Sequence, residues 1–245
     1  MSKKSREEKR AQTQGTNMSR FYFILGVIAV VGIGGVAWAV SRSNANTVTQ
    51  PVVLEGLDDM QRLVELAQGV TLGDPEAPIR IVEFGDYQCP GCGSFAQQVK
   101  PRINLAWIES GQASFVFYDF PLIQIHPNAF LAARAARCAG DQGRYWEYHD
   151  RLFAEQFRWS PSASALGFFV NYAEDIVPDG GAFEECLKSD RYADVVTANM
   201  RLGEELGVPS TPSVMISQGT GMARRLANFD FASIQEVVEE LQQGG

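Results

Sequence analysis

A strand that runs directly into a Cys-x-x-Cys motif constrains the fold of this chain most. Residues 79–84 are rich in β-branched side chains, as buried strands are, and Cys89 and Cys92 follow. Residues 92–110 then place apolar side chains on one face at helical spacing, and residues 113–120 form a second apolar segment. The sequence therefore predicts strand, crossover helix and parallel strand, with both cysteines at the first junction.

The rest of the chain continues this pattern. Pro101 lies inside the expected crossover helix and predicts a kink there. Residues 125–206 are helical in pattern and are interrupted by Gly and Pro clusters, which predicts a helical insert over about residues 123–206. A strand at 213–217, a weak hairpin partner at 222–228 and a helix at 231–241 are expected to follow.

The N-terminal part predicts a membrane anchor. Residues 21–40 carry no formal charge, and 20 residues are enough for one helical span of the hydrocarbon core. Residues 1–20 hold six basic and two acidic side chains, so they are expected to be cytoplasmic and the following domain extracytoplasmic. A signal peptide cleaved near 37–39 is the alternative, and a buried soluble helix is a weaker one.

The remaining organisation follows from composition. Residues 41–75 are interpreted as a linker and residues 76–245 as one domain. The chain has a net charge of −8, and the 225 residues after residue 20 carry 15 basic and 27 acidic side chains, so no basic stripe is left for nucleic acid. No dimerisation domain is visible, and a monomer is expected.

Cys89 and Cys92 have the spacing of a redox dithiol. Cys89 is placed just before the first helical turn, where backbone N–H groups and the helix dipole favour a thiolate. Cys92, one turn later, would be the resolving sulfur. Pro90 suits the first helical position, and Gly91 leaves the nearby backbone open to a partner chain. Half of a zinc site is the alternative, but Cys138 and Cys186 are a poor second half.

Glu83 is an acid in an otherwise apolar strand, six positions before Cys89. If it enters the core, burial raises its pKa, and the carboxyl group can carry a proton for Cys92. The alternative is that Glu83 points to solvent at a strand edge.

Three motifs resemble the DsbA family of thioredoxin-fold oxidoreductases: residues 83–92 (EFGDYQCPGC), 118–122 (YDFPL) and 207–214 (GVPSTPSV). Residues 143–153 also resemble the inserted helical domain of that family. The resemblance covers about residues 70–243 and implies an α/β thioredoxin fold with an inserted all-helical subdomain, preceded here by one transmembrane helix.

The resemblance also implies roles. Cys89 would be the attacking sulfur, Cys92 its partner and Glu83 the buried acid. A cis bond between Thr211 and Pro212 would place the Thr211 backbone beside Cys89, where a substrate strand can pair with it. An ordinary trans turn is the alternative. Gly91 departs from the family, which often carries a larger side chain there.

The expected activity is the introduction of disulfides into reduced secreted or periplasmic proteins, with no dissociable cofactor. A membrane partner of the DsbB or vitamin-K-epoxide-reductase type would reoxidise the dithiol. One alternative is a reductase or isomerase with the same fold, and another is a non-catalytic binding module such as a chaperone or metal carrier.

The second pair of cysteines, Cys138 and Cys186, is expected to form a structural disulfide in an oxidising compartment. Two free buried thiols, or a relay of oxidation to the first pair, are the alternatives. His126 and His149 are distant from the motif in sequence and are expected to be ordinary helix-end or surface residues.

Overall fold

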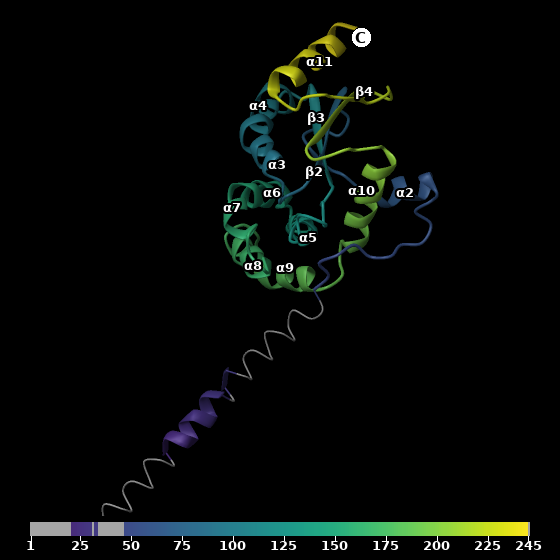
Figure 1. Cartoon of the computed structure of the whole chain (residues 1–245). Coiled ribbons are helices and arrows are strands. Elements are labelled where there is room, and N and C mark those ends of the chain that lie inside the picture. The colour runs from purple at the N-terminus through teal and green to yellow at the C-terminus, as the bar shows by residue number, and fades with distance from the viewer. Residues whose placement is uncertain (1–20, 31, 34–46, 245) are drawn as a thin grey trace, which may run out of the picture. The chain divides into compact units, whose positions relative to one another are not determined.

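The computed structural model describes residues 21–30, 32–33 and 47–244. Residues 21–30 and 32–33 are helical and belong to the predicted anchor, whose residues 31 and 34–40 lie outside the described residues, as do 1–20 and 41–46. Among the described residues, no helix combines the length and apolar character needed to cross a membrane. Met1–Asn46 and Thr47–Gly245 are separate units, and the second contains the fold (Figure 1).

A five-stranded sheet forms the centre of this second unit, in the order β1-β3-β2-β4-β5. The two central strands, β2 and β3, are parallel, whereas β1 pairs antiparallel with β3 and β4 antiparallel with β2. The bounds are β1 (Val70–Leu72), β2 (Ile79–Gly85), β3 (Ala113–Asp119), β4 (Ser213–Gln218) and β5 (Arg224–Arg225). The predicted thioredoxin-type β-α-β unit is confirmed.

The crossover helix starts at Pro90, as predicted from the cysteine motif, but it is not regular. It consists of α3 (Pro90–Ser94), the π-helical turn η1 (Phe95–Val99), α4 (Lys100–Ile103) and a second π-helical turn η2 (Asn104–Ile108). Just before Pro101, the Lys100 N–H donates to the Phe95 carbonyl five residues back. Proline has no N–H to continue the regular ladder, and the wider turn at η1 accommodates it.

The helical insert between β3 and β4 is confirmed. It contains α5 (Ala129–Gly140), α6 (Tyr145–Ala154), α7 (Gln156–Trp159), α8 (Leu166–Glu174), α9 (Gly180–Lys188) and α10 (Ala193–Glu205). Helix α11 (Phe231–Gly244) follows the β4–β5 hairpin. Figure 1 shows α8 and α9 at the opposite end of the folded unit from α11. Small alanines fill most of the buried face of α5, which lets α6 and α9 pack closely against it.

The folded unit begins well before residue 76, unlike the predicted linker. Helix α2 (Met60–Leu66) buries Leu63 against Ala198 and Leu202 of α10, and β1 adds a strand to the sheet edge. A possible short helix at residues 58–67 agrees with α2, whereas β1 is only three residues long and carries too little periodicity to be recognised. Their stability comes from long-range contacts with α10 and β3.

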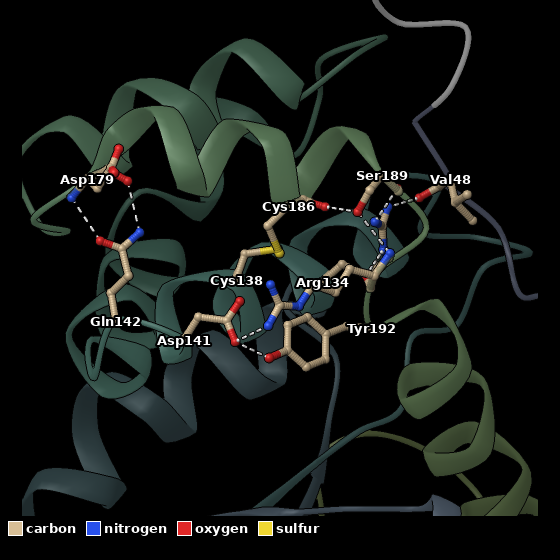
Figure 2. The surroundings of a disulfide bond; sticks show 10 residues. Val48, Arg134, Cys138, Asp141, Gln142, Asp179, Cys186, Ser189 and Tyr192 are labelled. Carbon is tan, nitrogen blue, oxygen red and sulfur yellow. Dashed lines mark hydrogen bonds and ion pairs between the residues drawn. A yellow bond between two sulfur atoms is a disulfide. The ribbon is translucent and has the colours of Figure 1, made fainter.

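A disulfide joins Cys138 on α5 to Cys186 on α9, across 48 positions of sequence. Figure 2 shows this bridge beside Arg134, whose guanidinium donates to the carbonyls of Val48 and Ser189. Arg134 also donates to the Arg191 carbonyl and is fully buried. The bridge ties α5 to α9, and Arg134 ties the start of the folded unit to the turn after α9.

Removing this bridge is expected to lower the free energy of unfolding by about 4 kcal/mol, because the unfolded chain loses a long closed loop. The measurement is urea unfolding of Cys138→Ala/Cys186→Ala in a Cys89→Ser/Cys92→Ser background, compared with that background alone. The background protein is expected to titrate no free thiol in denaturant. Two titratable thiols, or an unchanged unfolding midpoint, would contradict this role for the bridge.

Candidate active site

The two cysteines lie where β2 ends and α3 begins. Cys89 caps the helix in an extended conformation, Pro90 occupies the first turn, and the Cys89 N–H donates to the Asp86 carbonyl. Cys89 is partly exposed, whereas Cys92 is fully buried, and both are free thiols. The strand-to-helix junction therefore presents one sulfur to the surface and hides the other.

The surroundings of Cys89 favour the thiolate. The Cys92 thiol has the largest effect, and with the Thr211 side chain and the N–H groups of Cys92 and Gly91 it lowers the pKa of Cys89 from 9.0 to about 5, against the opposing effect of burial. A thiol with this pKa is almost fully ionised at neutral pH. Cys89 is therefore suited to be the nucleophile of exchange.

Cys92 has the opposite character. Burial is the largest of the effects that raise its pKa well above 9.0, and the Cys89 sulfur and the Glu83 carboxylate add to it. The Asp86 N–H, which lies 3.4 Å from Cys92 Sγ, is a weaker opposing influence. The Cys92 sulfur thus needs a proton when it is released from a disulfide.

Glu83 lies inside the molecule, not at a solvent-facing strand edge. Its side chain on β2 is fully buried, and neither carboxylate oxygen has a hydrogen-bond partner among the described residues. Burial raises the pKa of Glu83 to about 8, despite the opposing charge of Lys100. Lys100 is itself held by Asp150, 2.6 Å from its Nζ. Glu83 is therefore a carboxylic acid poised to exchange a proton near neutral pH.

The Thr211–Pro212 bond is cis, and this loop lies against the cysteine pair. Cys89 Sγ is 3.4 Å from the Thr211 carbonyl oxygen. A Cβ at Gly91 would come within 3.1 Å of the Pro212 ring and 3.6 Å of Cys89 Sγ. Glycine at position 91 therefore allows the proline loop to approach the cysteines closely.

The structure places other residues here that the sequence did not indicate. The buried Asp86 carboxylate accepts hydrogen bonds from the N–H groups of Gln88 and Leu122, and His126 Nδ1 lies 2.7 Å from it. This contact with Asp86 raises the pKa of His126, so His126 belongs to the site's surroundings. His149 is fully buried, and burial lowers its pKa to about 4, so the expectation of a surface residue is wrong for His149.

No local sequence signal pointed to His126 or Gln156. His126 is 40 positions from Asp86, and Gln156 is 67 positions from Cys89, whose carbonyl oxygen accepts a hydrogen bond from Gln156. Both lie in segments whose patterns indicated only a loop or a helix. Among the described residues, no cluster of three or more potential metal ligands occurs.

Comparisons with known proteins agree with this geometry. A family model described as thioredoxin matches residues 65–237. The probable disulfide bond formation protein D of Bacillus anthracis is 25% identical over 196 residues, which cover 79% of this chain and 88% of that protein. The crystal structure of oxidised BdbD from Bacillus subtilis is 25% identical, with a TM-score of 0.62, and the match covers 71% of this chain and 95% of that one.

The Na⁺/H⁺ antiporter NhaA 1 of Salinispora arenicola is 33% identical over 199 residues. The match covers 78% of this chain but only 29% of that protein, so the likeness concerns one part of a much longer polypeptide. The family match, the fold and the Cys-Pro-Gly-Cys motif at the strand-to-helix junction agree: the chain belongs to the thioredoxin family and, within it, to the DsbA-like thiol:disulfide oxidoreductases.

Proposed function

We propose that this protein introduces disulfides into reduced secreted proteins, with Cys89 and Cys92 as its redox pair. The observation that carries the proposal is the thiolate-favouring environment of Cys89, whose pKa is lowered to about 5. A stabilised thiolate stabilises the reduced pair relative to its disulfide. The disulfide form therefore gives its bond away readily and acts as an oxidant.

The steps follow from the two sulfurs. A substrate thiolate attacks Cys89 Sγ of the Cys89–Cys92 disulfide, and a mixed disulfide forms while Cys92 leaves. Glu83, protonated at neutral pH, gives its proton to the departing Cys92 sulfur. A second substrate thiolate then attacks the substrate sulfur of the mixed disulfide and releases Cys89 as a thiolate. The substrate is oxidised by two electrons, and the cysteine pair is reduced by two.

Substrate binding is assigned to the surface around Pro90, Gly91, Thr211 and Pro212. The backbone of Thr211 lies beside Cys89 and can pair with an extended segment of an unfolded chain. Main-chain pairing of this kind is tolerant of sequence, which suits an enzyme that meets many reduced proteins.

The location is part of the proposal. Residues 21–40 would anchor the protein in the cell membrane as a single span, with residues 1–20 in the cytoplasm and the catalytic unit outside. The uncharged segment and its basic flank support this arrangement. The Cys138–Cys186 disulfide supports an oxidising compartment, because such bonds rarely persist in the cytosol. A membrane oxidase of the DsbB or vitamin-K-epoxide-reductase type would reoxidise Cys89 and Cys92, and the catalytic unit would act as a monomer.

The test is the equilibrium reduction potential of the Cys89–Cys92 pair in a fragment of residues 47–245, titrated against glutathione. A thiolate pKa of about 5 lies between those of DsbA and thioredoxin, so we expect a value well above the roughly −270 mV of thioredoxin and nearer to the roughly −120 mV of DsbA. A value at or below that of thioredoxin would favour the rival function, a reductase with the same site.

A further inference from the structure

The short helix α7 of the insert contacts the backbone of the redox motif through one side chain. Gln156, at the start of α7, is almost completely buried. Its Nε2 donates to the Tyr87 carbonyl at 2.7 Å and to the Cys89 carbonyl at 2.9 Å. Both hydrogens of the amide are therefore used on the two carbonyls that flank Gln88, immediately before the reactive helix.

Gly93 makes room for this amide. A Cβ at Gly93 would lie 2.7 Å from Gln156 Oε1, closer than real Cβ contacts allow. Glycine inside a helix costs roughly 0.5–1 kcal/mol relative to alanine, so its presence here needs a compensating contact. The close approach of Gln156 to α3 is such a contact. Gly93 of the crossover helix and Gln156 of the helical insert fit against each other.

Neighbouring contacts hold the same segment through Gln88. Gln88 Nε2 donates to the Ser160 carbonyl at 2.9 Å, and the Asn128 N–H donates to Gln88 Oε1 at 2.8 Å. The fully buried Trp159 fixes α7 in turn, with its indole N–H donating to the Leu152 carbonyl. Residues 87–89 are therefore tied to the insert at three consecutive positions.

We propose that Gln156 is a positioning residue for Cys89, an assignment that rests on the proposed exchange activity of this site. By holding the Tyr87 and Cys89 carbonyls, Gln156 keeps Cys89 at the helix start, with its sulfur facing the N–H groups of Gly91 and Cys92. Without this amide, the turn between β2 and α3 loses two hydrogen bonds, and the geometry that stabilises the thiolate loosens. Gln156 does not contact the Cys89 sulfur itself, so it acts on the reactivity of that sulfur only through the position of the Cys89 backbone.

The test is the pH dependence of Cys89 alkylation by iodoacetamide in the full chain, read by mass spectrometry of the Cys89 peptide. Gln156→Ala is expected to move the midpoint upward by about 0.5 to 1 pH unit, the equivalent of one ordinary hydrogen bond. Gln156→Glu keeps the size of the side chain but removes both donors and adds negative charge beside the site, so a larger upward shift is expected.

Gln97→Ala is the matched control. Gln97 on η1 also connects the crossover helix to the helical insert, because its Nε2 donates to the Phe153 carbonyl of α6 at 3.2 Å. It makes no hydrogen bond with residues 87–89. In Gln97→Ala, the midpoint of the pH dependence of Cys89 alkylation should stay at the wild-type value. Wild-type midpoints in both Gln156 variants, or an equal shift in Gln97→Ala, would overturn the proposal. The readout does not depend on turnover, so a chain without exchange activity would count against the proposed function while the midpoints still test Gln156.

Discussion

Replacing either Cys89 or Cys92 with alanine is expected to reduce disulfide transfer to a reduced two-cysteine peptide to the uncatalysed rate, but only the Cys92 variant should trap a mixed disulfide with an oxidised peptide. The difference follows from their environments: the pKa of Cys89 is lowered to about 5, and that of buried Cys92 is raised well above 9.0. At pH 7 the Cys89 thiolate fraction exceeds that of an ordinary thiol by roughly 30-fold. Cys92→Ala keeps this nucleophile but lacks the sulfur that would resolve a mixed disulfide.

The measurement is transfer to the peptide, followed by mass spectrometry under non-reducing conditions. Cys92→Ala, challenged with an oxidised peptide, should accumulate a stable adduct through Cys89, and Cys89→Ala should form none. The Cys138–Cys186 bridge is present in both variants and serves as the internal control for folding. Adducts through Cys92, or undiminished transfer by Cys89→Ala, would show that the roles are assigned to the wrong sulfurs. Retained peptide binding by Cys89→Ala, without redox turnover in the wild type, would favour a binding module instead.

The cysteine pair was predictable because its signal is local. A β-branched strand, a Cys-x-x-Cys and an apolar helical face lie within about thirty consecutive residues, and each pattern has one dominant structural interpretation. Glu83 stood out for the same reason, as a single acid in an apolar strand. The cis bond at Pro212 was expected only through the family resemblance, since a proline before a strand is equally compatible with a trans turn.

The features that the sequence did not reveal depend on contacts between distant segments. Strand β1 has three residues and exists because β3 offers it an edge. Gln156 follows a helix whose pattern indicates only packing, and its role depends on where α7 places it relative to Cys89. Pro101 predicts an interruption of the crossover helix, but not that a π-helical turn accommodates it where η1 contacts α6. Long-range placement is decided by packing, and a single sequence specifies it only implicitly.

Replacing Glu83 with glutamine is expected to slow exchange while making the protein more stable at alkaline pH. The Glu83 carboxyl is buried without a hydrogen-bond partner among the described residues, and its pKa is raised from 4.5 to about 8. The folded state therefore binds a proton that the unfolded chain has already lost between these two values. The stability associated with that proton is fully present below about pH 4.5 and is lost as pH rises through about 8.

Glutamine cannot ionise, so Glu83→Gln escapes this loss. The free energy of unfolding of the variant should match that of the wild type near pH 4.5, apart from a pH-independent offset, and exceed it increasingly up to pH 8. The rise in the Glu83 pKa from 4.5 to about 8 corresponds to a gain in the free energy of unfolding of roughly 4 to 5 kcal/mol as an upper bound. Urea unfolding of both proteins at pH 5 and pH 8, in the oxidised form that keeps the Cys138–Cys186 bridge, measures the difference. Glu76→Gln, at an exposed turn, is the matched control and should show no such dependence.

Turnover gives the second readout for Glu83. General acid–base catalysis contributes roughly 10² to 10⁴-fold in enzymes, so a loss of about 100-fold is expected if Glu83 supplies the proton that the Cys92 sulfur needs. Unchanged turnover together with the stability gain would show that the acid is buried but not used. A stability difference that is the same at both pH values would instead mean that Glu83 is not the group titrating near pH 8. Slower exchange together with greater stability is the combination expected of a buried acid retained for its chemistry at the expense of the fold.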